Sequence, residues 1–305
     1  MNVRTIDPHV VILGGGGTRG FLHAGFTRAL LESHLPIASI TGISIGAWGA
    51  AFIGMGLPMD EIETIATEFD LNRIICFKSF FSVLWQHGSR YRGYFDPGFV
   101  AREIRGVVGN ATFRDTKIPI HIQATDLATG EPFVFSRDTT PDAPIALAVS
   151  ASCALVGVFH PVVYAGRTLV DGTYCGYMLP ESRPTLISNV SPIRGSENLG
   201  RKSILNLLLR SYSLLPQVII EEFKRKNPCV MEVQHDCRDV GVLAFNLSAE
   251  HKRELMRRSL SHSREALEAH IRALASRPGL RPGPRATLAR SSLRSARSRL
   301  GAPSC

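Results

Sequence analysis

An apolar run that ends directly in a run of glycines constrains the fold of this chain more than any other feature. Residues 9–13 read His-Val-Val-Ile-Leu, and residues 14–17 are all glycine. A short apolar run bounded by turn residues is typical of a buried strand. Residues 21–33 follow with apolar side chains at helical spacing. The chain is therefore predicted to begin its fold with a strand, a glycine loop and a helix.

The same alternation continues along the chain. Residues 37–40 form a second apolar run, residues 47–55 a helix rich in small side chains, and Pro58 opens a helix that ends at Phe69. Strands that alternate with helices are typical of an α/β domain with parallel strands. We therefore expect an α/β fold.

The remaining pattern predicts further elements. A long helix over 199–226 carries an apolar stripe that Pro216 interrupts. Residues 76–97 are aromatic-rich and irregular, and we interpret them as packing on the edge of the core rather than as the wall of a lipid-binding cleft. The other predicted strands cover 118–125, 132–135, 168–170, 185–187 and 240–245, and the other predicted helices cover 142–152 and 249–275.

The positive charge is concentrated at the C-terminal end. The 305 residues carry a net charge of +9, but residues 276–305 hold seven arginines and no acidic residue, which leaves about +2 for the remainder. Proline and glycine accompany these arginines, as in a flexible tail. We expect one domain over 1–275, with its motifs within about 10–180, a helical C-terminal extension and a tail over 276–305. No motif indicates specific nucleic-acid binding.

The composition also bears on compartment and cofactors. No apolar run reaches the roughly 18 residues of a membrane-spanning helix, and the first residues lack the pattern of a signal peptide. The six cysteines form no C-x-x-C pair and fit no zinc spacing, so we interpret them as reduced thiols. These features predict a cytoplasmic or peripheral membrane protein without metal or cofactor. Export by a non-classical route would leave no mark in the sequence, and the oligomeric state is not indicated.

A serine between two glycines follows the second predicted strand. Gly42-Ile43-Ser44-Ile45-Gly46 has the G-x-S-x-G spacing of a sharp turn from strand to helix, which exposes the serine oxygen. The N-terminus of the following helix adds partial positive charge near that oxygen. Ser44 is therefore a candidate nucleophile, with an ordinary glycine-flanked turn as the alternative.

The glycine loop disfavours a nucleotide site. Gly15-x-Gly17-x-x-Gly20 has the spacing of a dinucleotide fingerprint, but the acidic residue required near the end of the second strand is replaced by Thr41 and the serine turn. No Gly-Lys-Ser/Thr follows, so a phosphate loop is also excluded. A row of backbone N–H groups at a helix N-terminus remains, and it can bind the oxyanion of an acyl transfer. Arg19 either adds charge there, binds a phosphate group of the substrate, or is a solvated arginine.

Two residues are candidates for the base that activates the serine. Asp171-Gly172 follows a predicted strand, although such a pair is most often a simple turn. His235 is the only plausible histidine of a Ser-Asp-His triad, because the later histidines lie on a basic, solvent-facing helix. We favour a serine–aspartate pair.

The order of these motifs resembles the patatin-like phospholipase family. The segment Thr125–Phe135 is similar to the central hairpin of the family, and Ala148–Pro161 is similar to the segment before its aspartate. The resemblance covers about residues 10–180. It implies a three-layer α/β/α fold with a mainly parallel central sheet. It also implies a lipid acyl hydrolase that cleaves ester bonds of phospholipids or lysophospholipids at a membrane surface.

The resemblance also implies a role for each motif. Ser44 would be the nucleophile that forms an acyl-serine intermediate, and Asp171 the general base that takes its proton directly. Because an aspartate near its ordinary pKa is a weak base, we expect burial to raise the pKa of Asp171. The backbone N–H groups of Gly15, Gly16, Gly17 and Arg19 would form the oxyanion hole, with Gly20, Gly42, Gly46 and Gly172 as further motif residues.

Two positions depart from the family pattern. Val156 stands where a proline is common, and Thr173 stands where a small residue is usual. We expect both to affect local backbone support more than the chemistry. Two alternatives stay open, namely an esterase or thioesterase that uses His235, and a catalytically degenerate homologue that binds lipid.

The helix predicted over 249–275 combines an apolar stripe with basic residues such as Lys252, Arg253 and Arg257. Such a helix can dock on anionic lipid. A stripe of this width is normally part of a core, so we favour packing against the body of the protein.

Overall fold

The structure is a computed structural model, and it describes residues 6–70, 93–95, 98–176, 183–191, 204–227, 229–244 and 246–276. Most of the aromatic-rich segment 76–97 lies outside these residues, and so does the arginine-rich tail after Ser276. The expectations for these segments stay predictions.

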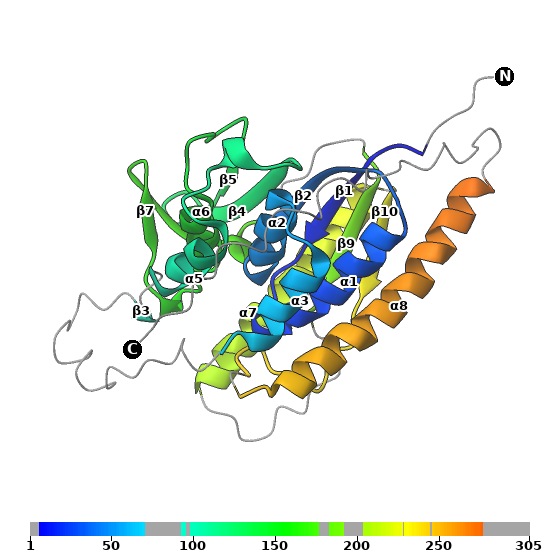
Figure 1. The fold of residues 1–305 in the computed structure, drawn as a ribbon. Coiled ribbons are helices and arrows are strands. Elements are labelled where there is room, and N and C mark those ends of the chain that lie inside the picture. Colours follow the sequence, from blue (N-terminus) through cyan, green and yellow to red (C-terminus); the bar gives the residue numbers. More distant parts are fainter. Residues whose placement is uncertain are drawn as a thin grey trace, which may run out of the picture.

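A mixed sheet of eight strands forms the centre of the molecule (Figure 1). The strand order is β10, β9, β1, β2, β4, β8, β7, and β5 also pairs with β4. The pairs from β10 to β4 are parallel, whereas β5, β7 and β8 pair antiparallel. Strands β3 and β6 form a separate parallel pair. The strands are β1 (His9–Leu13), β2 (Ile37–Ile43), β3 (Gly93–Phe95), β4 (Ile120–Asp126), β5 (Pro132–Ser136), β6 (Gly157–Phe159), β7 (Val162–Tyr164), β8 (Arg167–Asp171), β9 (Thr185–Asn189) and β10 (Val230–Gln234).

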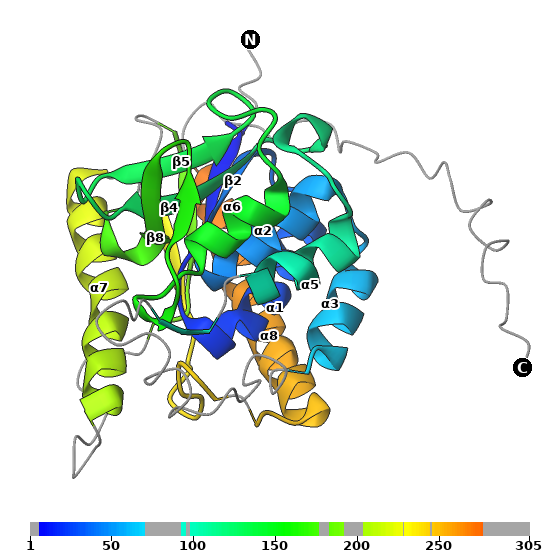
Figure 2. The same ribbon diagram turned by 90° about the vertical axis from the view of Figure 1, so that its left-hand side faces the viewer.

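Helices cover both faces of the sheet, which confirms the predicted three layers (Figure 2). Helix α7 lies on one face, and α1, α2 and α6 lie on the other, with α8 packed against α1. The helices are α1 (Phe21–Glu32), α2 (Ile45–Met55), α3 (Met59–Glu68), α5 (Gly98–Val108), α6 (Ile145–Ser152), α7 (Ile204–Lys226) and α8 (Ala249–Ala275). Three short 3-10 helices are η1 (Gly17–Gly20), η4 (Phe113–Asp115) and η5 (Gly172–Tyr174).

Side chains of β1 divide between two cores. Val11 and Leu13 belong to the large core with α1 and α2, whereas Val10 and Ile12 pack with Ile220 of α7. Successive side chains of a strand point to opposite faces, so a strand covered on both sides must be apolar throughout. This explains why residues 9–13 form an almost uninterrupted apolar run.

Strand β4 brings the ends of two other strands together. The last residue of the parallel strand β2, Ile43, is the partner of Gln123. The next residue of β4, Ala124, is the partner of Asp171, the last residue of the antiparallel strand β8. Because β5 occupies the other edge of β4, β2 and β8 share one edge and meet end to end. The residue that follows β2 is Ser44, so this register places it beside Asp171.

The structure corrects two expectations in the C-terminal half. Residues 240–244 form an irregular segment, not the predicted strand, because their carbonyl groups accept hydrogen bonds from η1. The carbonyl of Val240 accepts from Arg19 Nε at 2.7 Å, and that of Val242 accepts from the N–H of Thr18 at 2.9 Å. Strand β10, which the sequence pattern did not predict, instead extends the sheet beside β9.

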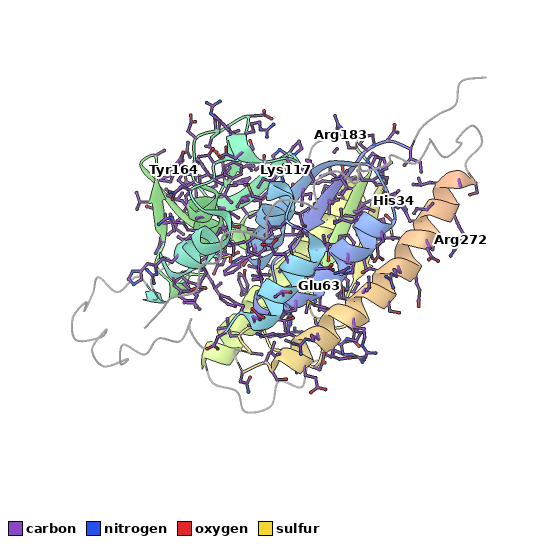
Figure 3. The ribbon with its side chains drawn as sticks, in the orientation of Figure 1. His34, Glu63, Lys117, Tyr164, Arg183 and Arg272 are labelled. Carbon is purple, nitrogen blue, oxygen red and sulfur yellow. The ribbon has the colours of Figure 1, made fainter. Side chains whose placement is uncertain are left out.

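Helix α8 confirms the predicted helix over 249–275 and buries its apolar stripe. Leu255 and Met256 pack with apolar residues of α1, and Leu267 belongs to the large core. Arg272 lies on the outer side of the helix (Figure 3). The stripe is therefore part of the core, as favoured from the sequence, and it is not free to enter a lipid surface.

Lys252 of the same helix is buried rather than part of the basic face. Its ammonium group donates hydrogen bonds to the carbonyl groups of Thr67 and Phe69, which end α3. Within the described ranges, no helix is both long enough and apolar enough to cross a bilayer.

The close packing of α1 on α8 makes a prediction about stability. A Cβ atom at Gly25 would lie 2.2 Å from the carbonyl oxygen of Met256 and 2.7 Å from the nitrogen of Leu260. Gly25→Ala should lower the free energy of unfolding by about 1–3 kcal/mol, because backbone atoms of α8 must move. The matched control is Gly106→Ala in α5, where a Cβ would meet nothing within 4 Å. It should be neutral or stabilising by up to ~1 kcal/mol. Urea unfolding of both variants checks this, and equal effects would contradict the packing described.

Candidate active site

Ser44 lies on a strained turn at the N-terminus of α2. Its backbone angles are φ 53° and ψ −124°, in a region that a residue with a side chain rarely adopts. The turn is possible because α2 packs very closely on β1, where a Cβ at Gly46 would lie 2.0 Å from the carbonyl oxygen of Leu13. A Cβ at Gly42 would likewise lie 2.5 Å from Ala47 Cα. Both glycines of the G-x-S-x-G motif are thus required by close approach.

The side chain of Asp171 receives a short hydrogen bond from this serine. Ser44 Oγ donates to Asp171 Oδ2 at 2.6 Å. The other carboxylate oxygen accepts from the N–H of Thr173 at 2.9 Å. Asp171 is 1% exposed, and burial raises its pKa above the ordinary value, with the hydrogen bonds acting in the opposite direction. A raised pKa makes the carboxylate a stronger base.

Two buried residues hold these groups in place. Ser152, at the end of α6, accepts the N–H of Ser44 at 2.9 Å and donates its hydroxyl to the carbonyl of Gln123 at 2.6 Å. The Gln123 amide nitrogen donates to the carbonyl of Gly172 at 2.9 Å. A Cβ at Gly172 would lie only 2.1 Å from the Gln123 carbonyl oxygen, so this motif glycine too is required by close approach.

The glycine loop lies beside the serine. A Cβ at Gly15 would lie 3.4 Å from Ser44 Cβ, and a Cβ at Gly20 would lie 2.2 Å from Ile45 Cγ1. Within the part of the chain that the structure describes, the N–H groups of Gly15, Gly16 and Gly17 have no protein acceptor. They are donors available to an anion near Ser44.

The environment of Arg19 differs from the expected one. Its side chain is 3% exposed and donates Nε to the carbonyl of Val240, so it is neither a solvated residue nor directed at an anion. Its backbone N–H donates to the carbonyl of Gly16 at 3.3 Å. The side chain ties the segment 240–244 onto η1, because a buried guanidinium requires an acceptor. We therefore remove Arg19 from the candidate oxyanion hole.

His235 lies in a separate buried hydrogen-bond network. Its Nε2 bonds to Ser188 Oγ at 3.0 Å and its Nδ1 to Ser259 Oγ at 3.3 Å. Ser188 also bonds to His23 Nδ1 at 2.9 Å, and His23 Nε2 donates to the carbonyl of Gly14 at 2.8 Å. Burial lowers the pKa of His23 to about 4 and lowers that of His235 as well. Both ring nitrogens of His235 are thus engaged away from Ser44, which disfavours the triad.

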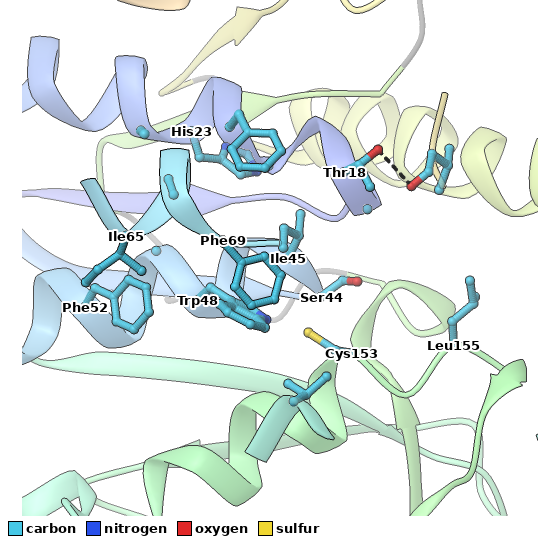
Figure 4. A pocket seen from close by; sticks show the side chains of 18 of the residues that line it. Thr18, His23, Ser44, Ile45, Trp48, Phe52, Ile65, Phe69, Cys153 and Leu155 are labelled. Carbon is cyan, nitrogen blue, oxygen red and sulfur yellow. Dashed lines mark hydrogen bonds between the residues drawn. The ribbon is translucent and has the colours of Figure 1, made fainter. Parts of the chain in front are cut away.

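An apolar cavity of about 170 Å³ opens beside Ser44. Figure 4 shows Ile45 and Trp48 near the serine, with Phe52 and Ile65 farther from it. Four residues of α2 line the cavity at helical spacing, namely Ile45, Trp48, Phe52 and Ile53. The cavity therefore runs along this helix. Helices α1 and α3 supply further walls, for example with Ala24, Ile62 and Ala66.

The site also contains residues that the sequence analysis missed. Tyr212 of α7 lines the same cavity as Ser44 and Asp171, and its hydroxyl donates to Thr173 Oγ1 at 2.9 Å. No local pattern marks Tyr212, because it lies on the apolar stripe of a long helix. Gln123 lies within the predicted strand 118–125 and Ser152 ends the predicted helix 142–152, and neither belongs to a motif of the sequence. Among the described residues, no group of His, Cys, Asp or Glu side chains could hold a metal ion.

Comparison with known proteins gives a consistent result. The sequence model described as patatin-like phospholipase matches residues 11–185, more than half of the chain. A protein of Acanthamoeba polyphaga mimivirus, described as uncharacterized, is 29% identical over 167 residues, which cover 52% of this chain and 56% of that protein. An NTE family protein of Mycobacterium tuberculosis is 31% identical over 167 residues, 54% of this chain and 43% of its own length. Lysophospholipase NTE1 of Mycosarcoma maydis is 30% identical over 169 residues, 54% of this chain and 8% of its own length. The chain thus spans about half the length of the first two relatives.

Solved structures support the fold. VipD from Legionella pneumophila superposes with a TM-score of 0.55 at 13% identity, covering 87% of this chain and 67% of that chain. The type III effector protein ExoU superposes with a TM-score of 0.50 at 15% identity, covering 87% of this chain and 53% of that chain. At these identities the similarity shows the fold alone.

The buried carboxylate makes a prediction about stability. Because burial raises the pKa of Asp171 in the folded protein, the unfolded chain releases this proton first as pH rises. The free energy of unfolding therefore falls as pH rises from the unfolded pKa to the folded pKa of Asp171, and it stays lower above that pH. Asp171→Asn keeps an acceptor for Thr173 and removes the charge. It should unfold at higher urea concentration than the wild type at pH 8, with a smaller difference at acid pH.

Asp126→Asn is the matched control, with an effect of opposite sign. The N–H of Ala128 and the guanidinium of Arg167 lower the pKa of Asp126. Loss of its charge should lower stability at pH 8. A loss of stability in Asp171→Asn at pH 8 would contradict this account of the buried carboxylate.

Proposed function

The chain belongs to the patatin-like phospholipase family, and on this premise we propose that it is a lipid acyl hydrolase with Ser44 as nucleophile and Asp171 as general base. The observation that carries the proposal is the 2.6 Å hydrogen bond from Ser44 Oγ to Asp171 Oδ2 at the mouth of an apolar cavity. A serine becomes a nucleophile when a base within hydrogen-bond reach accepts its proton.

The proposed first step forms an acyl-serine intermediate. As Ser44 Oγ attacks the carbonyl carbon of an ester, its proton passes to Asp171 Oδ2, and the carbonyl oxygen becomes an oxyanion. The N–H groups of Gly15, Gly16 and Gly17 are the proposed oxyanion hole, supported by the positive end of α2. The tetrahedral intermediate then collapses. The bond to the leaving alcohol breaks, and the alcohol takes the proton from Asp171.

The proposed second step returns the enzyme to its starting state. Asp171 accepts a proton from a water molecule, whose oxygen attacks the acyl-serine carbonyl. Collapse of the second tetrahedral intermediate releases the fatty acid and returns the proton to Ser44 Oγ. Each step uses the same carboxylate as acceptor and then donor, so a partly raised pKa suits it in both roles.

The cavity supports an acyl chain as the group bound beside the serine. Its walls from α1, α2 and α3 are mostly apolar, and helix α2 rises about 12 Å between Ile45 and Ile53. This length fits a medium acyl chain, on the order of eight to ten carbons. We propose phospholipids or lysophospholipids as the substrate class and a membrane surface as the place of reaction. In support, NTE1 of Mycosarcoma maydis is named a lysophospholipase.

Two alternatives predict different results. A Ser-Asp-His esterase requires His235, whose ring nitrogens bond to Ser188 and Ser259. A degenerate lipid-binding homologue would lack a reactive serine. The strained turn at Ser44 and its hydrogen bond to a buried carboxylate support a reactive serine instead. We therefore favour the hydrolase with a serine–aspartate pair.

Substitution of the three candidate residues separates these functions. Ser44→Ala and Asp171→Asn should each reduce ester hydrolysis by at least about 10³-fold while the far-UV circular dichroism is unchanged. His235→Gln, which keeps an amide near the position of Nε2, should retain activity within a few-fold of the wild type. The measurements are release of fatty acid from phosphatidylcholine vesicles and labelling by a fluorophosphonate probe. Wild-type protein without labelling would favour the degenerate homologue, and an inactive but folded His235→Gln would favour the triad.

The proposed acyl cavity predicts a chain-length preference that one residue at its far end controls. Phe52→Ala lengthens the cavity away from Ser44 and should shift the best substrate in a series of p-nitrophenyl esters to longer chains. The reason is that added methylenes are each worth about 0.8 kcal/mol once buried. Val163→Ala, an exposed position on β7, is the control and should leave the preference unchanged. An unchanged preference in Phe52→Ala would show that the acyl chain binds elsewhere.

A further inference from the structure

Two hydrogen bonds connect helix α7 to Thr173 and Thr173 to the Asp171 carboxylate. The Tyr212 hydroxyl donates to Thr173 Oγ1 at 2.9 Å, and the N–H of Thr173 donates to Asp171 Oδ1 at 2.9 Å. Thr173 is fully buried and Tyr212 is 8% exposed. Thr173 is the position at which the resemblance to the family leads us to expect a small residue. The departure therefore coincides with a partner that lies 39 residues away.

Thr173 and Tyr212 depend on each other. A Cβ at Gly15 would lie 2.4 Å from Thr173 Oγ1, so the threonine hydroxyl fills the space between the glycine loop and Asp171. With a small residue there, the buried Tyr212 hydroxyl would lose its acceptor, at a cost typical of an unsatisfied polar group. Without Tyr212, the threonine oxygen would lose its donor.

The surroundings make these hydroxyls important for the charge of Asp171. The other titratable groups that face it are Cys153, which follows α6, Tyr174 at the end of η5, and Cys175, which follows η5. Burial raises the pKa of each of these three groups, so they are neutral near pH 7. Of the described residues that shift the pKa of Asp171, none is a cation. A buried carboxylate without a cation relies on hydrogen-bond donors.

The direction of the hydroxyl protons completes the relay. Since Thr173 Oγ1 accepts the proton of Tyr212, its own proton is available to the carboxylate. Both hydroxyls lower the pKa of Asp171 and so oppose the effect of burial. Each hydrogen bond polarises the next one in such a chain.

We propose that Thr173 and Tyr212 are positioning residues, a relay of two hydroxyls that holds the Asp171 carboxylate toward Ser44 and stabilises its negative charge. The inference rests on the proposed function, because both residues act on the reaction through Asp171. Helix α7, which the sequence motifs do not include, thereby becomes part of the active site.

The test is the pH dependence of kcat/KM in two conservative variants, Tyr212→Phe and Thr173→Val, with a short-chain p-nitrophenyl ester. Activity requires the ionised carboxylate, so it rises with pH through the pKa of Asp171 in the free enzyme. Loss of one relay hydroxyl should move this acid limb upward by about one pH unit, as expected for a hydrogen bond to a charged group. KM should change little. The double variant should show a shift smaller than the sum of the two single shifts, because the Tyr212 hydroxyl donates to Thr173 Oγ1.

Tyr164→Phe on β7 and Thr168→Val on β8 are matched controls, which lose the same hydroxyl groups outside the relay and should keep the wild-type limb. Acid limbs of Tyr212→Phe and Thr173→Val that coincide with the wild type would overturn the relay. So would a double variant whose shift is the sum of the two single shifts.

A separate measurement keeps the relay testable if the proposed function fails. Wild-type protein that neither hydrolyses esters nor reacts with a fluorophosphonate probe would refute the hydrolase. The relay is then judged by the free energy of unfolding as a function of pH. Because Asp171 is a buried acid with a raised pKa, stability falls as pH rises to that pKa. In Tyr212→Phe and Thr173→Val, the free energy of unfolding should continue to fall to a pH about one unit higher than in the wild type. A pH dependence parallel to that of the wild type would overturn the relay.

Discussion

The pairing of β2 and β8 with one edge of β4 is the constraint on which the site depends. Ile43, the last residue of β2, pairs with Gln123 of β4. Asp171, the last residue of β8, pairs with Ala124, the next residue of β4. The strand ends meet because β8 runs antiparallel where β2 runs parallel. Hydrogen bonding within the sheet thus places Ser44 and Asp171 in contact without a loop to position either one. Sites on regular elements are held more precisely than sites on loops.

Burial is the second constraint, and it acts in two directions. It raises the pKa of Asp171 toward the range useful for a base, and it makes the ionised form costly for the folded state. The donors around the carboxylate, Ser44, Thr173 and Tyr212, limit this cost. Active sites are commonly places where stability is lower than it could be. In this protein, hydrogen bonds rather than a counter-ion stabilise the buried charge of Asp171.

Segments distant in sequence cover the glycine loop from several sides. The segment 240–244 lies over η1 through Thr18 and Arg19, and His23 holds the carbonyl of Gly14. The N–H groups of the loop are thereby kept in one arrangement before a substrate arrives. Preorganised donors are effective because they need no reorganisation during the reaction. The buried histidines thus contribute hydrogen bonds to the structure of this loop.

The sequence by itself determined the local parts of this protein. The apolar run of β1, the glycine loop and the G-x-S-x-G turn are visible because backbone conformation and burial on both faces restrict the residues at each position. The order of motifs was sufficient to identify the family. Only the tertiary structure showed that Asp171, and not His235, is hydrogen-bonded to Ser44. It also showed that the backbone N–H of Arg19 is engaged by Gly16, and that residues 240–244 are an irregular segment over the glycine loop rather than a strand. It also supplied Tyr212 as a partner for Thr173. Most of these outcomes depend on hydrogen bonds between residues that are far apart in the sequence, such as Arg19 with Val240 and Ser44 with Asp171, which no local pattern encodes.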